Sequence, residues 1–152
     1  MRIFDVNVKG IFFVVEAVLK QMVAVGVRGS IIDMSSQAGR GGKPLVSQHC
    51  ASKAAVISYT QSAALAMAPV GIRVNGILRE SSIRRCAHVH AAFAKYQVLA
   101  IGEKKIAVGK ASPLGRMGTS KNMAGAAVFL ADEGSTHITA QTRNVDGGNC
   151  MS

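Results

Sequence analysis

Long helical stretches alternate with short apolar runs along this sequence, and that alternation narrows the possible folds more than any other feature. Apolar residues recur at helical spacing over residues 5–24, and Gly26 and Gly29 end the pattern. A short β-rich run follows at 30–35, and a second long periodic segment covers 47–68. Strands that alternate with helices favour an open parallel sheet with helices on its faces, so we expect an α/β fold.

The rest of the chain continues the alternation after one segment that is hard to interpret. A second strand is expected at 72–78, and a last short strand at 141–146. Thr119 is a good N-cap for a helix that runs to about Ala131. Residues 79–112 carry only a weak helical pattern, and we expect them to form a mobile insert. The 152 residues therefore predict a single domain with about three strands.

The net charge of +10 raises the possibility of nucleic-acid binding. The basic residues are spread along the chain, however, and the densest spots, Arg84-Arg85 and Lys104-Lys105, are only pairs. Two tyrosines and no tryptophan leave little aromatic surface on which bases could stack. We therefore expect no nucleic acid as a partner, and the charge alone keeps that alternative open.

Hydropathy and cysteine usage suggest a cytoplasmic protein. The richest apolar run, 11–15, stops at Glu16, which is too short for a membrane span. We see no secretion signal at the N-terminus, and expect no membrane partner. Cys50, Cys86 and Cys150 are odd in number and widely spaced, so we expect reduced thiols and no metal site.

Three polar residues are spaced in a way that suggests catalysis. Ser36 follows the first predicted strand, and His49 and Lys53 lie four residues apart on the next predicted helix, where they share one face. A lysine cation there disfavours an imidazolium and leaves a neutral His49 that can accept a proton. The alternatives are a serine that caps the strand end, a neutral histidine on a helix face and a solvated lysine.

Five separated segments resemble the short-chain dehydrogenases/reductases, in the order found in that family. They are residues 5–10, 31–36, 50–56, 72–75 and 144–148. Family members use a Ser, a Tyr and a Lys, and this chain resembles them at Ser36 and Lys53 but has His49 at the tyrosine position. Within the family, the bacterial sorbitol (polyol) dehydrogenases are most similar, through three further segments. These are residues 36–40, 102–105 and 115–119.

The resemblance implies the oxidation of a polyol or another secondary alcohol to a ketone, with NAD or NADP as cofactor. It also implies roles for single residues: Ser36 steadies the substrate oxygen, while Lys53 and Asn7 help to bind the cofactor and complete the active site. Residues 79–112 correspond to the family's mobile substrate loop. Asn7 has an alternative role near a helix N-cap.

The sequence also departs from the family pattern in three places. It lacks the Gly-rich turn that holds the cofactor pyrophosphate, and Arg79-Glu80 stands where the family has Pro-Gly. The imidazole of His49 is shorter than a phenol, which leaves open whether the chain is an active enzyme. We therefore expect the C-terminal part of a Rossmann-like doubly wound sheet, a single partial domain over 1–152 without its dinucleotide-binding half. Restoring Tyr at position 49 alone should not restore turnover.

Two functions are expected for a chain that resembles the family but lacks its dinucleotide-binding half. One is a truncated dehydrogenase with weak or no activity alone. The other is a non-catalytic oligomerisation partner of a full-length dehydrogenase, through its two long helices and its last strand, as the resemblance implies. Because the strand at 30–35 would keep an unpaired edge, we expect a homo-oligomer or association with a full-length relative.

Overall fold

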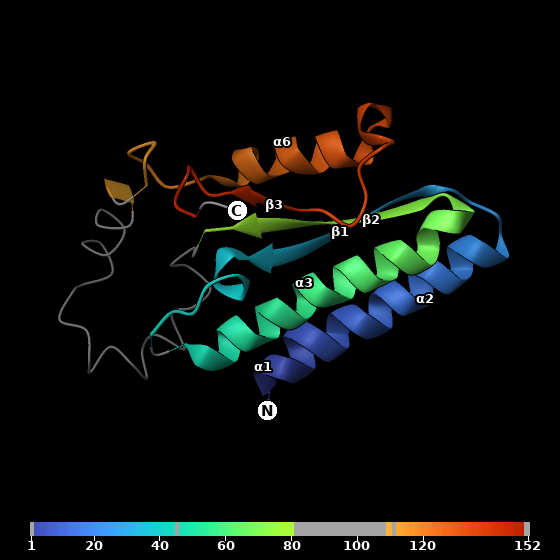
Figure 1. The fold of residues 1–152 in the computed structure, drawn as a ribbon, viewed down its shortest axis with the longest axis horizontal. Helices are drawn as coiled ribbons and strands as arrows, with labels where there is room; N and C mark the ends of the chain where they lie inside the picture. Colours follow the sequence, from blue (N-terminus) through green and yellow to red (C-terminus); the bar gives the residue numbers. More distant parts are fainter. Residues whose placement is uncertain (1, 45, 81–108, 111, 151–152) are drawn as a thin grey trace.

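A three-stranded parallel sheet forms the centre of the molecule, as predicted (Figure 1). The computed structural model describes residues 2–44, 46–80, 109–110 and 112–150. The strands are β1 (Gly29–Ser36), β2 (Ile72–Arg79) and β3 (Thr142–Val145). They lie side by side in the order β1-β2-β3, and both pairings are parallel. The expected strands are therefore confirmed in number and direction.

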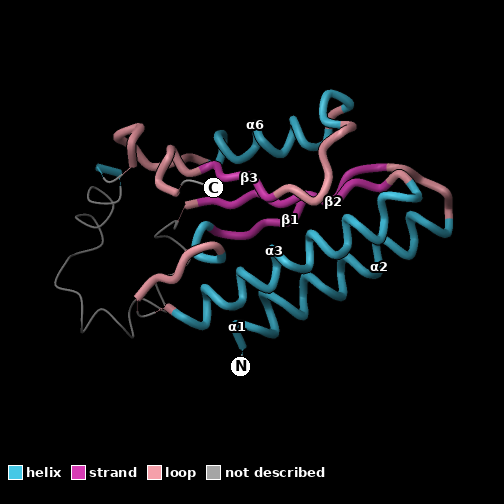
Figure 2. The backbone as a smooth tube through the Cα atoms, in the orientation of Figure 1, coloured by secondary structure: helices cyan, strands magenta, loops and turns pink. Residues whose placement is uncertain are grey.

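The two long helices lie on one face of this sheet and the third helix lies on the other (Figures 1 and 2). α2 (Gly10–Ala24) and α3 (Ser47–Met67) cover one face, and α6 (Ser120–Ala131) covers the opposite face. No helix in the described part of the chain is long and apolar enough to cross a membrane.

The helical segment that ends in α2 contains a turn that its apolar spacing did not predict. Helix α1 (Arg2–Phe4) continues into a π-helical turn, η1 (Asp5–Lys9), before α2 begins. A π-turn widens a helix locally and is often found at functional sites. Three short 3₁₀ turns complete the described elements. They are η2 (Gln37–Gly39), η3 (Ala68–Val70) and η5 (Glu133–Ser135).

Local signals fix where α6 begins. Thr119 and Asn122 form a capping box: the Thr119 N–H donates to Asn122 Oδ1 at 2.8 Å, and the Thr119 side chain accepts from the Asn122 backbone. The predicted N-cap is confirmed. The predicted mobile insert at 79–112 lies for the most part outside the described residues.

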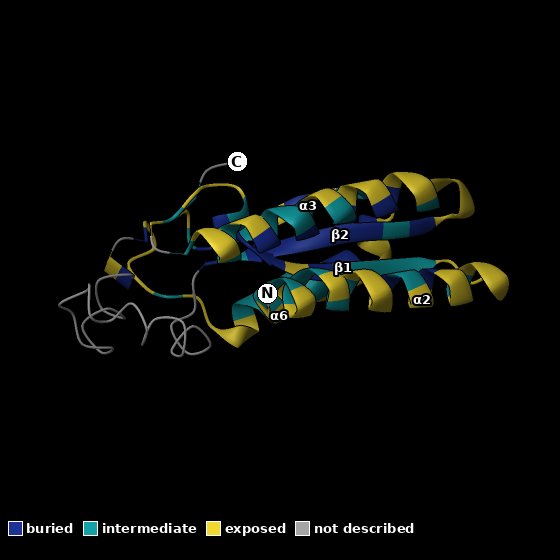
Figure 3. Cartoon of the chain, turned by 90° about the horizontal axis from the view of Figure 1, so that it is seen from below, coloured by how far each residue is buried: buried dark blue, intermediate teal, exposed yellow. Residues whose placement is uncertain are grey.

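The core is built from α2, α3 and β2. Its buried apolar side chains are Val15, Leu19, Ala63, Ala64, Ile72 and Val74. Figure 3 shows β2 buried along most of its length, whereas β1 is only partly buried over its first half. Among the described residues β1 has a strand partner on one side only, so its other edge is open, as expected.

The loop after β1 is tied to the far side of the sheet. The Nη2 of Arg40 donates to the backbone oxygen of Thr142 at 2.6 Å and to its Oγ1 at 2.8 Å. Because Thr142 begins β3, this pair of hydrogen bonds joins the loop after β1 to the first residue of the strand on the other side of β2. The loop itself follows the carboxyl end of β1, and sites in parallel sheets form at that end of the strands.

Candidate active site

Lys53 reaches from α3 to the carboxyl end of β1. Its Nζ donates to the backbone oxygen of Met34 at 2.9 Å, and its side chain is half-buried. Burial lowers the pKa of Lys53 below its ordinary value, and the charge of Arg79 lowers it further, although Asp33 opposes the shift. Lys53 is thus a half-buried, hydrogen-bonded lysine, and its roles toward cofactor and substrate remain predictions.

A close backbone contact sets the position of Lys53. Gly39, in the turn after β1, lies so near α3 that a Cβ at this position would be 2.7 Å from the Lys53 carbonyl carbon and 2.8 Å from the Ala54 nitrogen. The Ser35 Oγ adds a hydrogen bond to the Lys53 backbone oxygen at 2.9 Å. Only glycine fits this contact without displacing the helix or the turn.

Ser36 is buried, and its hydroxyl is bound to the backbone. Its Oγ accepts from the Ala38 N–H at 3.2 Å and donates to the Arg79 oxygen at 3.4 Å. These contacts cap the turn η2 and join the ends of β1 and β2. They agree with the strand-end role that the sequence left open, and a role for Ser36 toward substrate remains a prediction.

Asn7 and His49 are connected through a third residue, Ser52. The Asn7 Nδ2 donates to the Ser52 Oγ at 3.1 Å, and that Oγ donates to the His49 backbone oxygen at 2.8 Å. Asn7 lies within the π-turn η1, so it does not act as the helix N-cap that we considered as an alternative. These two hydrogen bonds connect Asn7 to the first turn of α3. The chemical roles of Asn7 and His49 remain predictions.

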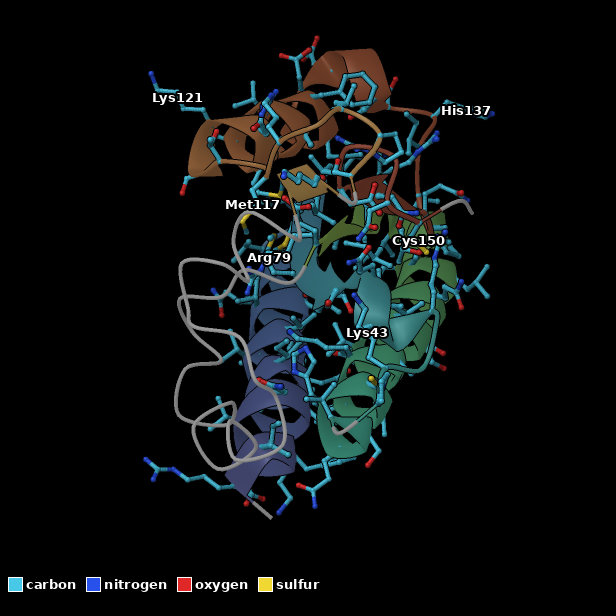
Figure 4. All side chains as sticks on the ribbon, turned by 90° about the vertical axis from the view of Figure 1, so that its left-hand side faces the viewer. Lys43, Arg79, Met117, Lys121, His137 and Cys150 are labelled. Carbon is cyan, nitrogen blue, oxygen red and sulfur yellow. The ribbon has the colours of Figure 1, made fainter. Side chains whose placement is uncertain are left out.

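A pocket of about 430 Å³ opens beside Lys53, between the carboxyl end of β2 and the start of α6. Figure 4 shows this end of the molecule, with Arg79 and Met117 close together. The polar residues that line the pocket are Ser35, Lys53, Arg79, Glu80, Thr119 and Ser120. Neither Ser36 nor His49 is among the described residues that line it. Of the predicted catalytic residues, Lys53 alone is among the described residues that line this pocket, and the catalytic roles of Ser36 and His49 remain predictions.

Glu80 is a pocket residue whose role we did not predict. Only 4% of its surface is exposed; one carboxylate oxygen accepts from the Gly118 N–H, and the other, Oε2, has no hydrogen-bond partner among the described residues. The sequence did carry a signal, because Arg79 and Glu80 are charged residues at the carboxyl end of a buried strand. The family resemblance marks the same two residues only as a departure from its Pro-Gly pattern.

Comparisons with known proteins place these observations in context. A family model described as enoyl-(acyl carrier protein) reductase matches residues 1–149. The chain is 52% identical to galactitol 2-dehydrogenase of Agrobacterium fabrum and 50% identical to sorbitol dehydrogenase of Cereibacter sphaeroides, each over 154 residues. Each match covers 99% of this chain but 59% of the relative, so the chain spans about three-fifths of these proteins.

A solved structure of similar fold agrees with the sequence relatives. The structure of NAD⁺-bound xylitol dehydrogenase superimposes with a TM-score of 0.84 at 29% identity, covering 97% of this chain and 58% of that one. Both the helices and the parallel sheet described above therefore have counterparts in a solved dehydrogenase.

Proposed function

This chain belongs to the short-chain dehydrogenase/reductase family, and on that premise we propose that it carries the substrate-side part of a polyol dehydrogenase. The proposed reaction oxidises a secondary alcohol of the polyol to a ketone, with NAD or NADP as hydride acceptor. The observation that supports it most is the pocket beside Lys53, in a chain 52% identical to galactitol 2-dehydrogenase.

Oxidation of an alcohol removes a hydride from the carbinol carbon and a proton from its hydroxyl. In our proposal Lys53, held by the Met34 carbonyl, donates a hydrogen bond to an oxygen in the pocket. His49, one helical turn before it, accepts the proton, by way of water because its imidazole does not line the pocket. Catalysis is expected to be weak, since errors of about 1 Å in such an arrangement can cost about 100-fold in rate.

The described residues do not fit a complete dinucleotide. A pyrophosphate needs free backbone N–H groups at a glycine turn before a helix. Beside the pocket, Gly118 precedes α6, but its N–H donates to the carboxylate of Glu80, which places a negative charge there. We therefore assign no step to the cofactor and expect this chain alone to bind it weakly.

Polyol binding tests the proposal without requiring turnover. We expect galactitol and sorbitol to bind the chain in calorimetric titrations, and Lys53→Met to weaken binding about tenfold, as expected for a lost hydrogen bond to a charged group. Lys20→Met, an exposed change on α2, is the matched control and should have no effect. Absence of polyol binding by the unaltered chain would contradict the proposal.

A specific surface also supports the second candidate function, a non-catalytic subunit. An apolar groove of about 560 Å³ runs between α2 and the open edge of β1. Its apolar lining includes Ile11, Val14, Val18, Ile31, Ile32 and Met34. Exposed apolar patches of this kind mark contact surfaces, and an open strand edge can pair with another chain.

Mixing experiments distinguish this second candidate from the first. The chain should sediment together with full-length galactitol 2-dehydrogenase of Agrobacterium fabrum, and Val14→Lys, in the groove, should abolish that association. Leu114→Lys changes a similarly exposed residue outside the groove and should leave it intact. A chain that remains monomeric in both the presence and absence of the relative would rule out this role.

A further inference from the structure

The carboxylate of Glu80 is buried, and one of its two oxygens accepts no hydrogen bond from the described residues. Its side chain lines the pocket beside Lys53, and Oε2 has no partner among the described residues, while the other oxygen holds the Gly118 N–H. Burial of a charged oxygen without a donor is costly, and a donor that arrives in the pocket removes that cost. The geometry therefore favours a ligand that offers a hydrogen at this point.

The two cations of the pocket, Lys53 and Arg79, would bind the opposite kind of ligand atom, a hydrogen-bond acceptor. Lys53 and Arg79 are donors without acceptor capacity, so they can bind oxygen atoms of a ligand with the N–H groups that are not already used. A hydroxyl group can both donate and accept, and a chain of hydroxyls can satisfy Glu80 and the two cations together. A phosphate or carboxylate placed against Oε2 would bring it no hydrogen and would be repelled by its charge, although Lys53 and Arg79 attract anions elsewhere in the pocket.

We propose that Glu80 is a specificity residue of the polyol site, whose Oε2 accepts a hydrogen bond from a substrate hydroxyl. The pocket then selects a neutral polyol over the same polyol with an anionic group at that end. This inference rests on the proposed polyol function and adds a residue that neither the serine nor the lysine motif includes.

Binding of sorbitol and sorbitol 6-phosphate, measured by calorimetric titration, tests the role of Glu80. Glu80→Gln retains the shape and an oxygen for the Gly118 N–H, but places an N–H₂ donor where Oε2 was. We expect sorbitol to bind about tenfold more weakly to this variant, and the preference for sorbitol over its phosphate to fall or reverse. Glu133→Gln removes the same charge at an exposed position outside the pocket, and should change neither quantity.

The preference between the two ligands separates ligand contact from a purely structural role. An equal loss of affinity for both ligands, or no loss, would overturn the assignment of Glu80 and leave the proposed function standing. No sorbitol binding by the unaltered chain would overturn both. If Glu80→Gln proves unstable in thermal melts, Glu80→Asp, shorter by one methylene, tests the same contact: sorbitol should bind more weakly because the hydrogen bond is lost, but the preference for sorbitol should not reverse because the negative charge is kept.

Discussion

The neighbouring strands β1 and β2 have the same length but very different surroundings. β2 lies between two strands and is buried at six of its eight positions. β1 is buried only near its carboxyl end, where Ser35 and Ser36 meet the turn η2 and α3. The difference shows that the carboxyl end of the sheet is tightly packed in this chain, whereas the open edge of β1 lacks a covering element among the described residues.

The largest expected effect tests this difference in burial directly. Ile77 in β2 is fully buried, and Ile32 in β1 is only partly buried. Ile77→Ala should lower the free energy of unfolding by about 2–5 kcal/mol, and Ile32→Ala by less than half as much. Denaturant titrations of both variants measure the two losses. Equal losses would mean that the edge of β1 is covered in solution.

A smaller effect is expected at the tightly packed end of β1. Gly39→Ala should cost about 1–3 kcal/mol, because its Cβ would overlap the backbone of Lys53 and Ala54. Gly41→Ala, two residues further on, has no neighbouring atom within 4 Å and is the matched control. Thermal unfolding gives the stability, and polyol titration reports whether Lys53 has moved. Equal stability of the two variants would contradict the close contact.

The smallest effect concerns the pH dependence contributed by Asp33 in β1. Burial raises its pKa above the ordinary value of 3.8, despite a hydrogen bond from Thr60 and the charge of Lys53. The folded chain thus holds this proton more tightly than the unfolded chain does. The stability contributed by Asp33 should therefore rise as the pH falls from its folded pKa to 3.8, and then level off.

Comparison of the unaltered chain with Asp33→Asn isolates this contribution, because all other groups titrate in both proteins. Unfolding free energies measured across the acidic range should show a relative gain for the unaltered chain on acidification, worth about 1.4 kcal/mol for each unit of pKa shift. A relative loss would show that ion pairing, and not burial, dominates at this position.

Sequence periodicity predicted most of the fold because the determinants are local. Apolar spacing indicated the two long helices, Thr119 supplied the cap of α6, and the β-rich run at 30–35 indicated β1. The π-turn at Asp5–Lys9 was missed, since one extra residue in a turn barely changes apolar spacing.

The site could be predicted only in part, because contacts across the fold decide it. Spacing on one helix related His49 to Lys53, but the backbone oxygen that holds the Lys53 ammonium belongs to β1. Glu80 shows the same limit: its partner Gly118 is 38 residues away in sequence, and no local pattern links the two. Charged residues at the carboxyl end of a buried strand are the signal that could have identified it.

The hydrogen bonds from Arg40 to Thr142 have a consequence for how the chain acquires its structure. They join residues 102 positions apart, so the loop after β1 cannot make them until Thr142 has been synthesised. Contacts between such distant positions form late and slow folding. During translation α2, β1 and α3 therefore emerge well before β3, and the loop after β1 gains this anchor only when β3 has joined the sheet.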